Sequence, residues 1–223
     1  MKKHILYSFR RCPFAIRARW ALIKSSIRVE LREVDLKNKP LDLIKSSQNK
    51  TVPLLILNNG LIIEESLEII LWSLSNSNVV DQKKYFPSNF ENEILNIIRE
   101  NDQEFKFHLD RFKYANRFND VNKDFHFYQA KTIIKKWNDI LLKNSKRNFW
   151  LVGENESIAD WCIWPFVRQF KIACDHQNIS NYFDNPMIQW LNYFETNTIF
   201  KDIMTKYKIW DESSKVSYFP SDL

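Results

Sequence analysis

The chain contains few glycines and no long hydrophobic run. Only two glycines, Gly60 and Gly153, occur among its 223 residues, which excludes the glycine-rich loops that cradle dinucleotides or nucleoside triphosphates. No apolar stretch approaches the roughly 20 residues that a membrane-spanning helix requires. Met1 leads into a strand-like run without the apolar region of a signal peptide, so we expect no secretory signal and no membrane partner.

Cysteine is also scarce, and its spacing is informative. The three cysteines, Cys12, Cys162 and Cys174, lie far apart or in apolar helical patterns. This spacing argues against a disulfide framework or a zinc site. The four histidines are scattered and form no cluster with cysteine or aspartate, so we expect no metal. The usage of cysteine indicates an intracellular, cytoplasmic protein.

The net charge of +6 is unevenly distributed. Residues 1–50 hold 13 lysine and arginine residues against 4 aspartate and glutamate residues, a charge of +9, while the remainder carries −3. Because these charges are dispersed and form no dense run, we expect no nucleic-acid partner. The field would attract a small anionic ligand, although a solvated basic surface explains the same distribution.

Cys12 is the principal candidate for chemistry. It follows the strand-like run Ile5–Tyr7 and precedes a helical pattern, so its sulfur is expected at a helix N-terminus, where free backbone N–H groups and the helix dipole favour a thiolate. Pro13 suits the first helical position, and Arg10 and Arg11 add positive charge beside the thiol. The alternative is a buried, inert structural cysteine.

The residue three positions after Cys12 narrows the possible reactions. A dithiol oxidoreductase carries a second cysteine there, whereas this chain has Ala15. A mixed disulfide at Cys12 would therefore require an external thiol for its resolution, and glutathione is a small thiol of this kind.

The first 77 residues alternate strand and helix patterns. We predict strands at 3–8, 28–34, 53–57 and 61–63, helices at 13–25 and 65–76, and a helical turn at 41–46. Asn59-Gly60 is typical of a hairpin turn between the last two strands. On the first helix Ile16, Trp20 and Ile23 should face the sheet. This order, βαβ followed by ββα, describes an α/β thioredoxin-like domain.

Several motifs in this region resemble the N-terminal domain of glutathione transferases, most of all the cysteine-bearing, omega-like class with its bacterial members. The motifs are CPFAIR (12–17), DLKNKP (35–40), TVPLL (51–55) and EES (64–66), and their order and spacing match the family. The later run Ser157–Asp160 resembles the family's helix-capping motif, so the likeness extends over nearly the whole chain.

The resemblance implies a glutathione site around Cys12. Pro53 would be cis, and the Val52 backbone would hydrogen-bond the cysteinyl part of glutathione in the manner of an added strand. Pro13 and Phe14 would contribute beside the sulfur, Phe14 through its backbone amide. The alternatives are an ordinary trans proline at a strand start and a Phe14 ring that packs in the core or lines the acceptor pocket.

The same resemblance assigns Glu65 and Ser66 to the γ-glutamyl end of glutathione. The residues alone would equally fit a helix cap and a first-turn acid. Lys39 resembles a family lysine that meets a glutathione carboxylate, with a solvated loop lysine as the alternative. Arg17 matches the family's basic residue after CPFA, but it could form only a structural ion pair, so it is not assigned to catalysis.

The composition indicates two domains. We predict a glutathione-binding domain at 1–77, a linker at 78–87 and an all-α helical bundle at 88–223, which together form the glutathione transferase architecture. Ser157 should cap a helix, with Asp160 reaching back to it, and Pro165 should kink that helix. The predicted helices are at 89–117, 124–143, 157–176, 186–196 and 199–208.

Residues of the acceptor pocket are harder to identify. Tyr114, Trp164, Arg168 and Trp210 are candidates, because the family binds its acceptor between the domains. An aromatic residue at helical spacing is more often part of a core.

These patterns predict a glutathione-dependent monothiol oxidoreductase with thioltransferase or dehydroascorbate reductase-like activity. Its acceptor would be a small electrophile or disulfide. One alternative is conjugation of glutathione to electrophiles, with Tyr7 or Ser8 activating the thiol. Another is a binding or regulatory protein on the same fold. The resemblance also implies a homodimer, although several cysteine-bearing relatives are monomers.

Overall fold

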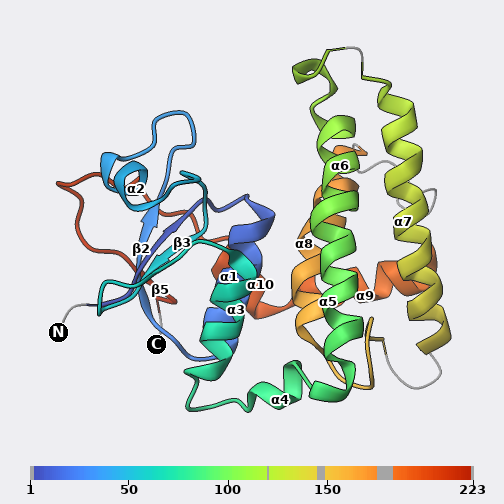
Figure 1. The fold of residues 1–223 in the computed structure, drawn as a ribbon, viewed down its shortest axis with the longest axis horizontal. Coiled ribbons are helices and arrows are strands. Elements are labelled where there is room, and N and C mark those ends of the chain that lie inside the picture. Colours follow the sequence, from blue (N-terminus) through green and yellow to red (C-terminus); the bar gives the residue numbers. More distant parts are fainter. Residues whose placement is uncertain (1–2, 120, 145–148, 175–182, 222–223) are drawn as a thin grey trace. The chain divides into compact units, whose positions relative to one another are not determined.

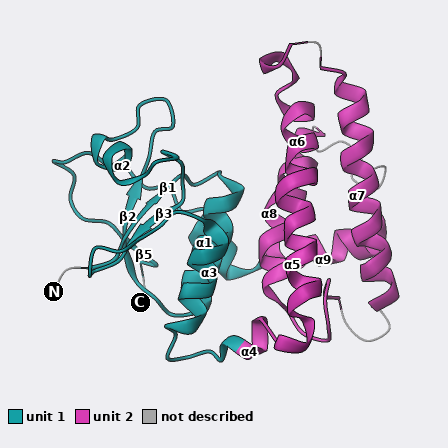
Figure 2. Cartoon of the chain, in the orientation of Figure 1, with its two compact units in different colours: residues 1–82, 197–223 teal, residues 83–196 magenta. Residues whose placement is uncertain are grey.

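The computed structural model describes residues 3–119, 121–144, 149–174 and 183–221. Its chain forms two compact units (Figure 2). The sheet unit comprises Met1–Gln82 and Asn197–Leu223, and the helical unit comprises Lys83–Thr196.

The sheet unit has the predicted thioredoxin-like order of elements, with a fifth strand from the C-terminal segment. Among the described residues its sheet has the order β4-β3-β1-β2-β5, in which β1 and β2 are parallel and the other neighbours antiparallel. Figure 1 shows α1 and α3 side by side along the sheet. The elements are β1 (Ile5–Ser8), α1 (Pro13–Lys24), β2 (Val29–Glu33), α2 (Leu41–Ser46), β3 (Leu54–Ile56), β4 (Ile62–Ile63), α3 (Ser66–Ser75), α10 (Thr198–Ile203) and β5 (Tyr218–Phe219).

Local sequence signals account for these elements. Pro13 occupies the first turn of α1, where a missing N–H has no cost. Ile16 and Trp20 are buried as predicted, with 1% and 0% exposure, whereas Ile23 is only half-buried. Gly60 has a φ of 91° in the turn between β3 and β4, a conformation that glycine adopts without strain.

The C-terminal segment belongs to a different unit from the one that the sequence predicted. Residues 197–223 were assigned from sequence to the helical bundle, but they pack within the sheet unit. Tyr218–Phe219 pairs with Val29–Glu30 as a strand, and the helix predicted at 199–208 ends at Ile203. A strand of two residues carries little periodicity of its own, so pairing with the open edge of β2 decides its conformation.

The second unit is built of helices, as predicted. The helix expected at 89–117 is divided by a π-helical turn at Asn101–Phe105, and the predicted end of the helix at 157–176 extends into residues outside those described. The described helices are α4 (Gln82–Tyr85), which begins on the last residue of the sheet unit, α5 (Glu91–Glu100), α6 (Lys106–Lys113), α7 (Lys123–Asn144), α8 (Ile158–Ala173) and α9 (Asn185–Thr196), with short 3-10 turns at Ser88–Phe90 and Ala115–Arg117.

The start of α8 confirms the predicted capping acid. The Asp160 carboxylate accepts hydrogen bonds from the Ser157 backbone N–H at 2.9 Å and from the Leu151 N–H at 3.0 Å. The Trp190 indole N–H donates to the same carboxylate at 2.9 Å. Asp160 is fully buried, so these donors replace the water that it loses on folding. The motif therefore joins α8, α9 and the preceding loop.

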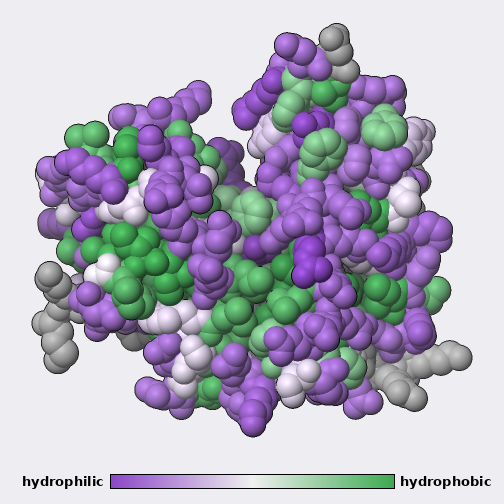
Figure 3. Space-filling model, in the orientation of Figure 1, coloured by the Kyte–Doolittle hydropathy of each residue, from purple (hydrophilic) through white to green (hydrophobic). Residues whose placement is uncertain are grey.

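Hydrophilic residues cover much of the face seen in Figure 3, and hydrophobic residues gather in patches between them. None of the helices in the described part of the chain is long and apolar enough to cross a membrane.

The place of the C-terminal segment can be tested with Phe219→Ala. Phe219 has 0% exposure, so loss of its ring should lower the free energy of unfolding by about 3–5 kcal/mol. Val216→Ala is the control, because Val216 lies on the same segment and is 54% exposed. Urea unfolding would measure both. Equal stability of the two variants would contradict the packing of this segment.

Candidate functional site

Cys12 occupies the N-cap of α1. Its backbone is extended, with φ −74° and ψ 122°, and its N–H donates to the Phe9 carbonyl at 3.0 Å, which closes a turn between β1 and α1. The Cys12 side chain is partly exposed, in contrast to the inert core cysteine that was the alternative. A sulfur at this position faces the unpaired N–H groups of the first helical turn, which stabilise negative charge.

The Val52-Pro53 peptide lies directly beside this sulfur. The peptide bond is cis, as the resemblance implied. The Cys12 thiol donates to the Val52 carbonyl at an Sγ–O distance of 3.6 Å. Val52 and Pro53 are both buried, and β3 begins at the next residue. A peptide joined to Cys12 through sulfur would therefore start alongside the Val52 backbone.

The N-terminus of α3 is tied to α1. Ser66 is the first residue of α3 and is buried, and its hydroxyl accepts a hydrogen bond from Arg17 Nε at 2.9 Å. Glu65 is the N-cap but makes no side-chain capping bond, and it is exposed. Its carboxylate is therefore not used as the helix cap that the residues alone allowed.

Two other residues predicted to bind glutathione, Phe14 and Lys39, are only half-buried. The Arg17 guanidinium lies over the Phe14 ring at 4.8 Å. Lys39 lies in the loop before α2. The structure thus brings Cys12, Val52 and Pro53 together and links Ser66 to them through α1.

Arg19 and Glu33 were not singled out from the sequence, and both lie under the Cys12 turn. Arg19 Nη2 contacts the Glu33 carboxylate at 2.8 Å, and the other carboxylate oxygen accepts from the Arg10 backbone N–H at 2.7 Å. Two features could have drawn attention to these residues. Arg19 follows Cys12 by seven residues, which places both on one side of a helix, and Glu33 ends a strand parallel to β1.

Both hydroxyls considered for conjugation already have hydrogen-bond partners. The Tyr7 hydroxyl accepts from Arg32 Nη1 at 2.6 Å, and the Ser8 hydroxyl accepts from Arg19 Nε at 2.8 Å. Burial raises the pKa of the Tyr7 phenol, while the Arg32 guanidinium acts in the opposite direction.

The four acceptor-pocket candidates have structural roles within their own units. Trp164 is fully buried and stacks on Phe194 at 5.3 Å, so it belongs to the core. Arg168 pairs with Glu195 at 3.3 Å. In the sheet unit the centroid of a Trp210 ring lies 6.0 Å from the Tyr7 ring centroid and 4.1 Å from the Arg32 guanidinium carbon. The Tyr114 ring lies 4.2 Å from the Arg117 guanidinium.

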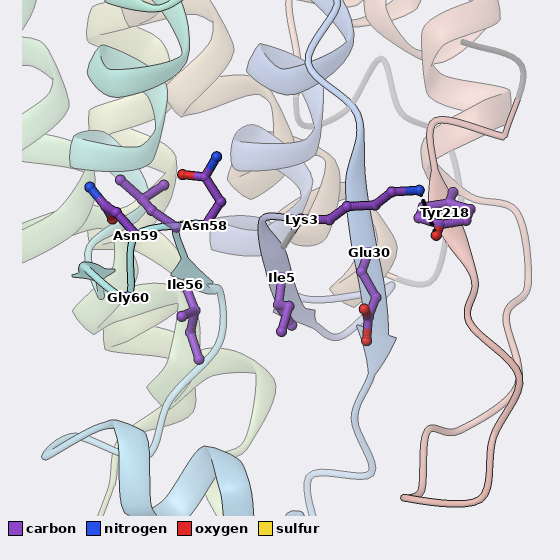
Figure 4. Close-up of a pocket in the computed structure, with 9 residues that line it drawn as sticks. Lys3, Ile5, Glu30, Ile56, Asn58, Asn59, Gly60 and Tyr218 are labelled. Atoms are coloured by element: carbon purple, nitrogen blue, oxygen red, sulfur yellow. Dashed lines mark hydrogen bonds between the residues drawn. The ribbon is translucent and has the colours of Figure 1, made fainter. Parts of the chain in front are cut away.

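A pocket of about 580 Å³ lies at the other end of β1 (Figure 4). Its lining includes Ile5, Glu30 and Ile56, together with the turn at Gly60. Ile5 begins β1, whereas the Cys12 turn follows its last residue, so this pocket contains no predicted site residue. Among the described residues no group of three or more histidine, cysteine, aspartate or glutamate side chains could hold a metal.

The link between α1 and α3 can be tested with Ser66→Ala. Loss of the hydroxyl removes an acceptor from the buried Arg17, so we expect the free energy of unfolding to fall by about 1–3 kcal/mol. Ser75→Ala, at the exposed end of the same helix, is the matched control and should change stability by less than about 0.5 kcal/mol. Denaturant titration separates the two, and an unchanged Ser66→Ala variant would contradict the assigned bond.

Comparison with known proteins agrees with this fold. Residues 6–78 match the family described as glutathione S-transferase, N-terminal domain. A tau class glutathione S-transferase from mango, Mangifera indica, is 21% identical with a TM-score of 0.75, covering 92% of this chain and 94% of that one.

Two further structures show the same likeness. A glutathione transferase family member from Pseudomonas fluorescens pf-5, with two glutathione bound, has a TM-score of 0.75 at 16% identity, covering 91% and 92% of the two chains. Glutathione transferase Omega 3C from Trametes versicolor has a TM-score of 0.76 at 14% identity, covering 93% and 91%. Residues 6–78 therefore match the N-terminal domain of that family, and the chain as a whole shares the two-part fold of these glutathione transferase structures.

Proposed function

We propose that this protein is a glutathione-dependent thiol transferase of the omega-like kind, with Cys12 as its nucleophile. The single observation that carries the proposal is the contact between Cys12 Sγ and the Val52 carbonyl. The contact joins a partly exposed thiol at a helix N-terminus to the backbone that precedes the cis Pro53. The matching domain family and the glutathione bound to the Pseudomonas fluorescens structure support glutathione as the co-substrate.

The residues around Cys12 fit the parts of glutathione. The cysteinyl part would lie along the Val52 backbone, with the buried Pro53 behind it and the Phe14 amide beside the sulfur. The γ-glutamyl carboxylate would meet the N-terminus of α3 at Ser66, and its ammonium group would meet the exposed Glu65. Lys39 would pair with the glycyl carboxylate. These groups are opposite in charge or complementary in hydrogen bonding.

The proposed reaction has two thiol-disulfide exchange steps. The Cys12 thiolate attacks the glutathionyl sulfur of a mixed disulfide, a Cys12–glutathione bond forms, and the substrate leaves as a thiolate that takes up a proton. A second glutathione thiolate then attacks the glutathionyl sulfur on Cys12. Oxidised glutathione leaves and the Cys12 thiolate is regenerated. One disulfide is reduced and one is formed, so no further oxidant or reductant is needed.

Ala15 gives this mechanism its monothiol character. A resolving cysteine at that position would release the first disulfide internally, but alanine cannot react, and its side chain is fully buried. External glutathione therefore has to resolve the intermediate. Dehydroascorbate has no disulfide, so its reduction would begin with addition of the Cys12 thiolate to a carbonyl carbon. A glutathione thiolate would then attack the Cys12 sulfur, forming the Cys12–glutathione disulfide and releasing the electrons of the carbon–sulfur bond to ascorbate, and a second glutathione would free Cys12 as above.

A reaction that consumes reduced glutathione suits a cytoplasmic protein, and we keep that location as part of the proposal. The homodimer stays a prediction that gel filtration would test. The regulatory alternative also stays open, because a fold by itself does not define an activity. It would be favoured by a protein that forms no adduct and binds no glutathione.

The proposal is tested by intact-mass analysis after incubation with oxidised glutathione. Wild type should gain one glutathionyl group, and Cys12→Ser should gain none and lose glutathione-dependent disulfide reduction by at least about 100-fold, because serine is a poor nucleophile at neutral pH. Cys174→Ser is the matched control, since Cys174 is also partly exposed, and it should retain both properties.

The opposite result would be equally clear. Adduct formation and turnover that persist in Cys12→Ser, but disappear in Cys174→Ser, would overturn the assignment of the nucleophile.

Conjugation is tested separately with Tyr7→Phe, which keeps the ring against Trp210 and removes only the hydroxyl. Because that hydroxyl accepts from Arg32, we expect glutathione-dependent disulfide reduction to change by less than about threefold, and little conjugating activity in either protein. An electrophile-conjugation assay would measure the second activity. A wild type that conjugates efficiently, with a loss of about 100-fold in Tyr7→Phe, would favour the conjugation mechanism instead.

A further inference from the structure

We propose that Arg19 and Glu33 are positioning residues for Cys12: Glu33 holds the turn that carries the sulfur, and Arg19 supplies the buried positive charge that favours its thiolate. The inference deepens the proposed function, because it concerns the same thiol. Glu33 acts through the backbone of the turn, and Arg19 acts through its charge.

Arg19 is fully buried, and each of its three guanidinium nitrogens donates a hydrogen bond. Its Nε donates to the Ser8 hydroxyl at 2.8 Å, and its Nη1 donates to the Ile203 carbonyl at 2.9 Å. Its Nη2 pairs with Glu33 at 2.8 Å. An arginine keeps its charge even in the interior, so a fixed cation lies between the end of β1, the end of α10 and β2.

Glu33 joins that cation to the Cys12 turn. One carboxylate oxygen faces Arg19, and the other accepts the Arg10 backbone N–H at 2.7 Å. Arg10 lies inside the turn that Cys12 closes onto Phe9. The carboxylate thus fixes the backbone two residues before the sulfur.

The C-terminal segment also forms hydrogen bonds with Arg10 and Glu33. The Arg10 guanidinium donates to the Met204 carbonyl at 3.1 Å, one residue beyond the Ile203 carbonyl that Arg19 uses. The Trp210 N–H donates to the Glu33 backbone carbonyl at 2.9 Å. The last carbonyls of α10 therefore receive two cationic donors, the arrangement that a helix C-terminus favours.

The two charges act on the thiol in opposite senses. A nearby cation lowers the pKa of a thiol and a nearby anion raises it. Burial lowers the pKa of Arg19, and the negative charge of Glu33 opposes this, with smaller contributions from Tyr207 and Cys12. The Cys12 contribution is the reciprocal of the effect proposed here. Burial keeps both charges of the pair away from solvent, so removal of either one leaves the other uncompensated.

Other charged groups around the thiol stay constant in the test. Arg10 and Arg11 lie on its own turn, Arg17 lies on α1, and Tyr207 on the C-terminal segment interacts with Arg19. Because the variants leave all of these unchanged, a difference between variants reports on the pair alone.

The experiment measures the pKa of Cys12 from the pH dependence of its alkylation by iodoacetamide, followed on the Cys12 peptide by mass spectrometry. Glu33→Gln keeps an acceptor for the Arg10 N–H and leaves Arg19 unpaired, so the pKa should fall by roughly one unit. Arg19→Met leaves Glu33 unpaired, so the pKa should rise. The double variant, which carries neither charge, should give a value between the two.

Two charge-matched controls come from the same strand region. Arg28→Met and Glu30→Gln remove charges about 10–16 Å along β2 from Glu33, and both should leave the pKa of Cys12 unchanged. If Arg19→Met does not fold, Glu33→Gln against the double variant still tests the sign, because only Glu33→Gln retains the cation. Thermal unfolding of each variant identifies which proteins are folded.

Opposite shifts in the two single variants would support the inference, because a purely structural loss would move both in the same direction. Shifts in the same direction, or no shift in either, would overturn it. The alkylation assay contains no glutathione. A protein without glutathione turnover but with opposite shifts would therefore refute the proposed function and leave the positioning role intact.

Discussion

The buried ion pair between Arg19 and Glu33 is the constraint on which the sheet unit depends. An uncompensated charge in the interior would cost several kcal/mol, so each polar atom of the pair needs a partner. Those partners come from separate segments: Ser8 at the end of β1, the Arg10 N–H in the following turn, and the Ile203 carbonyl at the end of α10. The pair is satisfied only when all of these segments are in place.

This requirement explains why the C-terminal segment belongs with the first residues of the chain. The end of α10 supplies carbonyls to Arg10 and Arg19, and Tyr218–Phe219 covers the edge of β2. An open strand edge and a helix C-terminus both carry unpaired backbone groups. The C-terminal segment thus pairs with the backbone at the edge of β2, and the carbonyls at the end of α10 find donors in Arg10 and Arg19. Arg10 belongs to the turn that carries Cys12.

The proposed nucleophile and the groups that fix its turn differ in their exposure to solvent. The Cys12 sulfur lies at the N-terminus of α1 beside the Val52 carbonyl. Arg19 and Glu33, which hold the turn, are buried in the core. Tyr7 and Ser8, which precede the turn, are bound by Arg32 and Arg19. Both hydroxyls are therefore engaged in hydrogen bonds, whereas the Cys12 thiol is partly exposed.

Much of the local structure could be predicted because its causes are local. Cys12-Pro13 marks a helix start, Asn59-Gly60 marks a hairpin, and Ser157 with Asp160 marks a second helix start, each through neighbouring backbone groups. The cis state of Val52-Pro53 came from the family resemblance. Trp164 was a candidate for the acceptor pocket, and its place in the core agrees with the general tendency of aromatic residues at helical spacing.

The sequence by itself determined the thioredoxin-like order of elements, the start of a helix at Cys12-Pro13 and the helical character of the second unit, because periodicity and short motifs encode each of them. Only the tertiary structure decided that residues 197–223 join the sheet unit and that Arg19 and Glu33 lie beneath the sulfur. Arg19 reaches Ile203 across 184 positions of the chain. Such pairings follow from which buried charges and open strand edges find partners in the folded protein, and no local pattern specifies them.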